Sequence, residues 1–347
     1  MNATAVSIFS LFATLAAGLS GQDGPLGAPA PALAIDKCVT GKAPTEFAAG
    51  QVYLVEFWGA APSFGIDRRR EFERLAKGHE GKLQVVGLMH GTESFGYDEV
   101  KSHYEEFGKD IAFCIGWDEG ARLHGAWPIA ADDEPPVAFL VDQKGRLVWT
   151  GGFAFLPLVL PAVLAGDVDP AALAKQTKEL EQKLVAVYLA AGFKPEKAIE
   201  LLDALLEAHP FLAESILPDV FGTMLEEGHR DVAMKLAKRV CDVAITSEDA
   251  ELLNGLAWVI VDPEVETEER DLALAERAAK KAVELTKEKD ANVLDTMARV
   301  CCAKKDYAGA VSWQKKAIAL VEDDEDEEIR DALRATLAEY EALAGKK

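Results

Sequence analysis

The stretch that decides the fold of the first half of this chain is Gln51-Val-Tyr-Leu-Val-Glu-Phe57, followed by Trp58-Gly-Ala-Ala-Pro-Ser-Phe-Gly65. The first segment is short, apolar and rich in β-branched and aromatic residues, and this pattern predicts a buried strand. Apolar residues at helical spacing between 67 and 77 predict a helix directly afterwards. The chain therefore turns from a strand into a helix within residues 58–65.

Strand and helix signals continue to alternate on either side of this turn. We expect further strands at 83–89, 111–115, 137–141 and 146–149, and helices at 97–107, 119–124 and 155–164. Asp142-Gln-Lys-Gly145 is a hairpin turn signal between the last two strands. Crossover strands followed by an antiparallel hairpin predict an α/β domain with a mixed sheet flanked by helices.

These features resemble the thiol-disulfide reductases of the TlpA/ResA kind within the thioredoxin-like superfamily. The resemblance rests on the strand at 52–58 with its following helix, on Pro135-Pro136-Val-Ala-Phe-Leu-Val-Asp-Gln-Lys-Gly-Arg-Leu-Val-Trp149, and on Ala32-Leu-Ala-Ile35 before a Thr-Gly-Lys turn. It covers about residues 32–166, and it implies a thioredoxin-like domain whose relatives are thiol-disulfide oxidoreductases.

This chain departs from the family at the two residues that carry the chemistry. The family places the motif F-W-A-x-W-C-x-x-C here, but Pro62 and Gly65 occupy the two cysteine positions. Exchange needs a thiolate at the helix N-terminus and a second thiol that resolves the mixed disulfide. Ser63 cannot replace them, because an unactivated hydroxyl stays protonated at neutral pH. We therefore expect no catalytic residue at this corner.

The resemblance also assigns the neighbours of the missing thiols. Glu56 matches the buried acid that passes a proton to the second cysteine, and without thiols we expect it to remain as a buried structural carboxylate. Pro136 matches the family's cis-proline, and the residue before it offers backbone groups to an extended peptide. Here that residue is Pro135, which has no N–H, so one docking hydrogen bond is lost with the thiols.

The remaining cysteines and histidines show no metal-binding or redox spacing. The five cysteines are Cys38, Cys114, Cys241, Cys301 and Cys302, and no C-x-x-C occurs. Their odd number and scattered spacing argue against a disulfide framework and against a zinc site made by cysteines. The six histidines form no metal-binding motif either. We expect no metal and no cofactor.

The N-terminus is typical of an export signal. Residues 1–21 contain an apolar run from Ala5 to Leu19 followed by small residues, although no Lys or Arg comes before Lys37. The run is short for a transmembrane helix. We expect a signal peptide, a flexible Gly/Pro/Ala-rich spacer at 22–31, and a periplasmic or cell-envelope protein, with membrane contact only if the signal remains uncleaved.

From residue 170 to 347 the sequence predicts an all-α domain with an internal repeat. Ala198, Ala233, Ala275 and Ala310 are 35, 42 and 35 residues apart, and an apolar residue follows each of them seven positions later. Leu253-x2-Leu256-Ala257-x2-Ile260 and Leu294-x2-Met297-Ala298-x2-Cys301 resemble the W-x2-L-G-x2-Y pattern of tetratricopeptide repeats. The aromatic residue usual in the second helix is missing, since Gln314 takes its place. A plain helical bundle is the alternative.

Charge limits the function classes. The 37 basic and 59 acidic residues give a net charge of −22, which disfavours nucleic-acid binding. Our leading hypothesis is an exported, non-redox scaffold whose helical repeats bind a protein or peptide partner. One alternative is a thiol-disulfide oxidoreductase that uses the non-motif cysteines. Another is a peptide-binding cleft around Trp58, Phe64 and Pro136 at the former active corner.

Overall fold

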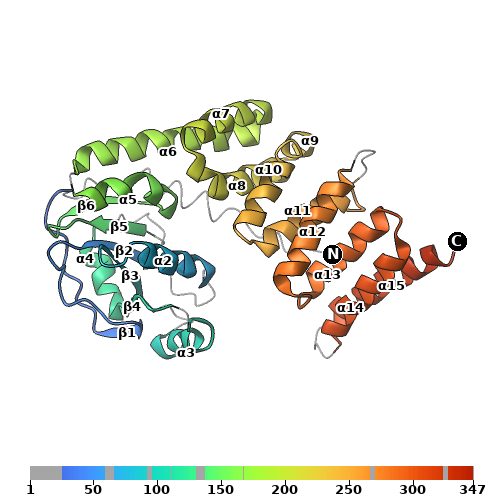
Figure 1. Cartoon of the computed structure of the whole chain (residues 1–347), viewed down its shortest axis with the longest axis horizontal. Helices are drawn as coiled ribbons and strands as arrows, with labels where there is room; N and C mark the ends of the chain where they lie inside the picture. Colours follow the sequence, from blue (N-terminus) through green and yellow to red (C-terminus); the bar gives the residue numbers. More distant parts are fainter. Residues whose placement is uncertain are drawn as a thin grey trace. The chain divides into compact units, whose positions relative to one another are not determined.

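The computed structural model describes residues 26–58, 66–91, 96–109, 111–129, 137–166, 168–265, 270–322 and 327–346. The chain divides into two compact units, residues 1–186 and residues 187–347. The described strands all belong to the first unit, and the described part of the second unit is helical (Figure 1). No helix in the described ranges combines the length and the apolar character needed to cross a membrane. The expected signal peptide, 1–21, lies outside them.

The first unit is built on a six-stranded mixed sheet. Its hydrogen-bonded order is β1 (Lys37–Thr40), β4 (Cys114–Trp117), β3 (Leu83–Met89), β2 (Val52–Trp58), β5 (Val137–Val141) and β6 (Leu147–Gly151). Strands β2, β3 and β4 are parallel, whereas β1, β5 and β6 run antiparallel to their neighbours. Parallel crossover strands followed by an antiparallel hairpin are the thioredoxin-like arrangement, so the predicted fold class is confirmed.

Helices connect and cover these strands. They are α2 (Ile66–Gly78), α3 (Tyr97–Phe107), α4 (Arg122–Ala126), α5 (Leu156–Ala165) and the first part of α6 (Pro170–Phe193), with 3-10 turns at Glu119–Ala121 and Phe153–Phe155. Side chains alternate across β2, as in any strand. Tyr53, Val55 and Phe57 belong to the core cluster that also contains Leu123 and Trp127.

The strand signal at 111–115 was only partly right. Ile111 and Phe113 are buried, as the apolar pattern predicts, but β4 begins at Cys114. The backbone N–H groups of Ala112 and Phe113 donate instead to the Glu73 carboxylate, at 2.9 and 3.2 Å. A side chain from α2 therefore replaces the neighbouring strand here. The short edge strand β1 was not predicted, because four residues carry too little periodicity.

Part of the expected flexible spacer is held against the sheet. Gly27 donates its backbone N–H to Leu147 at 2.7 Å, and Leu147 donates to Ala28 at 2.9 Å. Ala30 donates to Gly145 at 2.9 Å. Leu26 and Ala30 also pack against the core cluster. The structure therefore corrects the spacer prediction for residues 26–31, which run beside the β5–β6 hairpin.

The first compact unit extends beyond the expected boundary at 166. Helix α6 begins at Pro170, where the helical domain was predicted to start, but the division between the units falls after Ala186. Trp149 of β6 donates its indole N–H to the Thr177 hydroxyl at 3.0 Å, and both side chains are buried. This contact attaches the first half of α6 to the sheet.

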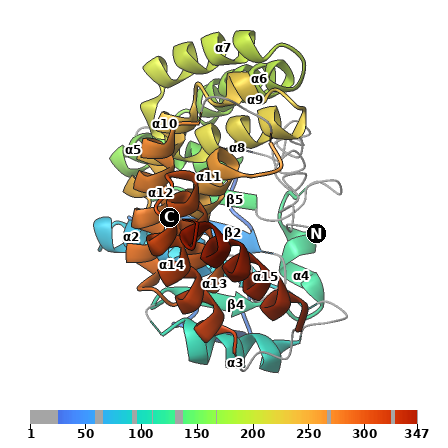
Figure 2. The ribbon, with the colours of Figure 1, turned by 90° about the vertical axis from the view of Figure 1, so that its right-hand side faces the viewer.

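The second unit continues as a series of helices. They are α7 (Pro195–Ala208), α8 (Ala213–Glu226), α9 (Arg230–Ala233), α10 (Ala237–Thr246), α11 (Ala250–Val261), α12 (Leu272–Thr286), α13 (Ala291–Ala303), α14 (Tyr307–Leu320) and α15 (Glu327–Ala344), with a 3-10 turn at Pro210–Leu212. From α11 to α15 each helix packs on the next, and Figure 2 shows α13, α14 and α15 side by side. The four repeat alanines are completely buried.

The longer repeat step coincides with the connection between α11 and α12. The Arg270 guanidinium donates to the carbonyl oxygens of Ile260 at 2.6 Å and Asp262 at 2.8 Å. Those carbonyls lie at the end of α11, where backbone acceptors have no partner within the helix. The extra residues thus bring an arginine that satisfies the helix terminus.

Candidate functional site

The candidate site is the edge of the sheet at which the parallel strands end. Strand register places Trp58, Met89 and Trp117 in one row across β2, β3 and β4. Asp118, directly after this row, donates its backbone N–H to Met89 at 2.7 Å. Open α/β sheets bind ligands beyond the carboxyl ends of their strands, so this row marks where a ligand would meet the fold.

Glu56 lies two residues before that edge and is fully buried. Its carboxylate accepts a hydrogen bond from the Trp58 indole N–H on the same face of β2. The Glu56 carboxylate therefore lies deep in the sheet and is hydrogen-bonded to a core indole, as buried polar groups usually are.

Trp58 is a core residue. Its side chain is only 5% exposed, and its ring packs edge-on against Phe72 at 6.0 Å and Phe113 at 6.1 Å between centroids. It also lies directly over Gly87, where an added Cβ would come within 2.2 Å of the indole ring. The idea that Trp58 offers an exposed aromatic surface is therefore wrong. The other predicted corner residues lie outside the described residues: Pro62, Ser63, Phe64, Gly65, Pro135 and Pro136.

Two histidines that the sequence patterns did not single out meet at this edge. His90 directly follows β3 and His124 lies on α4, and their ring centroids are 5.5 Å apart. Burial lowers the pKa of His124, and the neighbouring His90 lowers this pKa further against the opposing effect of Asp118. The position of His90 directly after a predicted strand could be read from the sequence, whereas the approach of His124 on α4 could not. Within the described ranges, no three potential metal ligands come together.

A buried aspartate fixes α4 beside the sheet edge. Asp118 accepts hydrogen bonds from the backbone N–H groups of Leu123 and His124, both at 2.9 Å. It is 2% exposed. Negative charge at a helix N-terminus satisfies amides that lack a partner within the helix. Asp118 therefore fixes the start of α4 relative to the end of β4.

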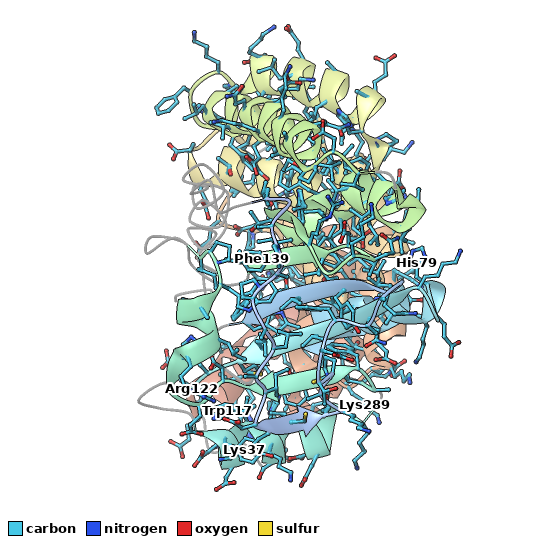
Figure 3. All side chains as sticks on the ribbon, turned by 90° about the vertical axis from the view of Figure 1, so that its left-hand side faces the viewer. Lys37, His79, Trp117, Arg122, Phe139 and Lys289 are labelled. Carbon is cyan, nitrogen blue, oxygen red and sulfur yellow. The ribbon has the colours of Figure 1, made fainter. Side chains whose placement is uncertain are left out.

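A polar cluster covers the outer end of the same edge. The Trp117 indole N–H donates to Glu119 at 3.0 Å, and Lys37 Nζ lies 3.6 Å from a Glu119 carboxylate oxygen and 4.9 Å from the Tyr97 ring centroid. Figure 3 shows Lys37 and Trp117 close together on adjacent strands, with Arg122 beside them. These charges are exposed, so each ion pair adds little stability.

None of the five cysteines lies at the edge row. Cys114 is level with Val86 and, through β3, with Val55, three residues before the edge. Three residues of a strand span about 10 Å. Cys38 is on β1, and Cys241, Cys301 and Cys302 are on α10 and α13 of the second unit. The structure does bring Cys38 and Cys114 together, with their Sγ atoms 3.8 Å apart, which the sequence spacing did not predict.

No protein-family model matches this chain. Among curated proteins, FixW of Rhizobium leguminosarum is 23% identical to it over 148 residues, which make up 41% of this chain and 67% of FixW. Among solved structures, a thiol-disulfide isomerase from Corynebacterium glutamicum is 22% identical, with a TM-score of 0.31, over 40% of this chain and 98% of that one. A thioredoxin-like superfamily protein is 23% identical, with a TM-score of 0.32, over 41% and 99% of the two chains. The similarity to these proteins is confined to the thioredoxin-like part of this chain.

Proposed function

We propose that this chain is an exported interaction protein in which a thioredoxin-like domain without motif cysteines acts as a scaffold. The observation that carries the proposal is the placement of sulfur. Pro62 and Gly65 stand at the two motif positions, and all five cysteines lie elsewhere. A thiol that begins exchange has to be accessible at the start of the helix after β2, where the helix dipole stabilises the thiolate.

The second unit supplies the surface for a partner in this proposal. Leu253, Leu256, Ala257 and Ile260 of α11 are all buried, and so are Leu294, Met297, Ala298 and Cys301, each 41 residues later on α13. Recurrent buried positions on successive helix pairs support a tetratricopeptide-like array. Arrays of this kind bury their faces against neighbouring repeats and form a concave surface that suits a protein or peptide.

The N-terminal segment bears on where this protein works, and the net charge bears on which partners it binds. The apolar segment within 1–21 supports export to the periplasm or cell envelope, with membrane attachment if the segment is retained. The net charge of −22 disfavours nucleic acids as partners. We propose no cofactor, because the sequence carries no metal-binding or dinucleotide-binding motif.

A thiol-disulfide oxidoreductase is the second candidate, because the Sγ atoms of Cys38 and Cys114 are 3.8 Å apart. Turnover requires a substrate to reach the sulfurs repeatedly. Cys114 is only 5% exposed and lies three residues before the sheet edge. A peptide cleft anchored on Trp58 is not proposed, since that side chain is buried.

Reduction of insulin by dithiothreitol separates the first two candidates. The proteins compared are the wild type, a variant with all five cysteines changed to serine, and the double variant Pro62→Cys/Gly65→Cys. We expect the wild type and the cysteine-free variant to give the same background rate. The double variant should exceed that rate at least tenfold, because it restores both thiols at the helix start. A wild-type rate well above the cysteine-free rate would support the oxidoreductase instead.

Affinity capture from the native envelope tests the binding part of the proposal. The intact chain and its cysteine-free variant are used as baits, each with and without dithiothreitol. We expect both baits to retain the same partner in the presence of the reductant, because contact and not a mixed disulfide holds it. A partner that only the wild type retains, and that dithiothreitol releases, would contradict the proposal.

A further inference from the structure

The two cysteines of the described sheet, Cys38 and Cys114, lie on two hydrogen-bonded strands, β1 and β4. Cys114 is the first residue of β4. Their Sγ atoms are 3.8 Å apart, although 76 positions separate the residues in the sequence. Cys114 belongs to the core cluster and Cys38 packs against that cluster, so both thiols are on the same side of the sheet.

Strand register explains this proximity. Cys38 is opposite Gly116, and Cys114 comes two positions before Gly116, so strand alternation directs both side chains to one face. The register then shifts between Cys38 and Thr40. Such an irregularity bends the strand locally, and here it brings the diagonal partner within reach of Cys38.

Contacts on both sides of Cys38 hold β1 in this position. The Tyr97 hydroxyl on α3 donates to the Cys38 carbonyl at 3.0 Å, and the Thr40 hydroxyl donates to the Phe113 carbonyl at 3.0 Å. Gly41 has φ of +64° and lies so close to Phe113 that an added Cβ would be 2.5 Å from its carbonyl oxygen. The two strands are therefore in firm contact where the sulfurs meet.

We propose that Cys38 and Cys114 are a disulfide-forming pair, a modification site separate from the missing C-x-x-C. At 3.8 Å the sulfurs are in van der Waals contact, and an S–S bond of about 2.05 Å needs a further approach that small side-chain rotations supply. The site goes beyond the proposed binding function and does not depend on it.

The oxidant in this proposal is a low-molecular-weight or protein disulfide, of the kind that oxidising compartments such as the periplasm provide. The half-buried Cys38 loses its proton, attacks one sulfur of that disulfide and releases the other as a thiolate. Cys114 then loses its proton and attacks Cys38, which forms the internal bond and releases the second thiolate. Two electrons and two protons leave the protein, and the external disulfide is reduced to two thiols.

The order of attack follows from burial. Burial, together with the adjacent Cys38, raises the pKa of the Cys114 thiol above its ordinary value. The more accessible Cys38 therefore reacts first, and Cys114 reacts once the mixed disulfide has formed beside it. The product closes a loop that contains β2, α2, β3 and α3, and this loop includes the edge at Trp58 and Met89. We assign the bond a stabilising role, because it restricts the unfolded chain.

The test uses the full chain equilibrated with oxidised glutathione, quenched in acid and alkylated after denaturation. We expect a mass loss of about 2 Da from one S–S bond, a cross-linked peptide pair containing Cys38 and Cys114, and three alkylated thiols. Reduction should lower the thermal midpoint by roughly 5–15 °C, since the closed loop is long. Five alkylated thiols, or a cross-link between Cys301 and Cys302, would overturn the proposal.

Variants make the assignment specific. Cys38→Ser and Cys114→Ala should each lose the effect of reduction on the thermal midpoint. The half-buried Cys38 is included because a substitution at the buried Cys114 can lower stability by itself. Cys241→Ala, in the second unit, is the matched control and should keep the effect. A Cys38→Ser protein that still shows the wild-type shift would contradict the assignment. Insulin turnover that depends on the pair would contradict the proposed binding function but not the disulfide.

Discussion

At the scale of a single residue, the buried Glu181 makes the stability of this protein depend on pH. It lies on α6 and is 7% exposed. Burial raises the pKa of the Glu181 carboxyl from 4.5 to about 7, and the opposing effect of Lys178 is smaller. Between these two values the folded protein holds a proton that the unfolded chain has released.

The sign of the effect follows directly. The contribution of Glu181 to stability is fully present below pH 4.5 and is lost as the pH rises through about 7. Glu181→Gln should therefore raise the free energy of unfolding at pH 8 by roughly 1–3 kcal/mol and change it little at pH 4. Urea denaturation at both pH values measures this difference. Glu179→Gln is the control, since Glu179 is exposed on the same helix. An equal gain at both pH values would contradict the argument.

The residues of the site were predictable only where the motif is local. Pro62 and Gly65 can be aligned with the four-residue motif C-x-x-C, so the absence of cysteine at both positions can be read from the sequence alone. The burial of Trp58 was not, because it depends on Phe72 and Phe113 packing around the ring. Pairs such as Cys38 with Cys114 arise from strand register between distant segments, which residue spacing does not encode.

At the scale of the element, four helices of the second unit share the same kind of N-terminal cap. Four consecutive helices begin after an aspartate whose carboxylate accepts a hydrogen bond from a backbone N–H in the first turn; the aspartates are Asp249, Asp271, Asp290 and Asp306. The first amides of a helix have no partner within it, so each aspartate both satisfies a donor and places negative charge at the positive end. This regular capping helps to fix where each of these four helices begins.

Asp290 provides the test of this role. Its carboxylate accepts from Asn292 at 2.9 Å and Val293 at 3.2 Å at the start of α13. Asp290→Ala should lower the free energy of unfolding by about 1 kcal/mol, whereas Asp290→Asn should retain most of it because asparagine also caps well. Urea denaturation followed by circular dichroism compares the two variants. Equal losses in both would show that the side-chain hydrogen bond is not what matters.

The boundaries of elements followed the sequence where an element is long or fully apolar. The predicted strand at 83–89 and helix at 97–107 coincide with β3 and α3. The signal failed at β1, a four-residue edge strand, and at the start of β4, where Glu73 from α2 takes up backbone donors. In both places tertiary contacts, and not local periodicity, decide where the strand lies.

At the scale of the whole molecule, the chain carries two cores. Phe139 is fully buried in the core cluster of the sheet, in the first unit. Tyr340 is fully buried on α15, in the second unit, with the Arg299 guanidinium 5.1 Å from its ring centroid. Each unit therefore has an apolar interior large enough to unfold cooperatively.

Calorimetry of the full chain should accordingly resolve two transitions. Removing a buried aromatic ring costs about 3–5 kcal/mol, which corresponds to a fall of roughly 6–20 °C in the midpoint of a unit of this size. Phe139→Ala should lower one midpoint and Tyr340→Ala the other, while Phe193→Ala, at a side chain that is 80% exposed, should leave both nearly unchanged. If Phe139→Ala and Tyr340→Ala instead lower a single common transition, the units unfold as one body, and a scaffold unit with a separately folding binding unit is the wrong description of this protein.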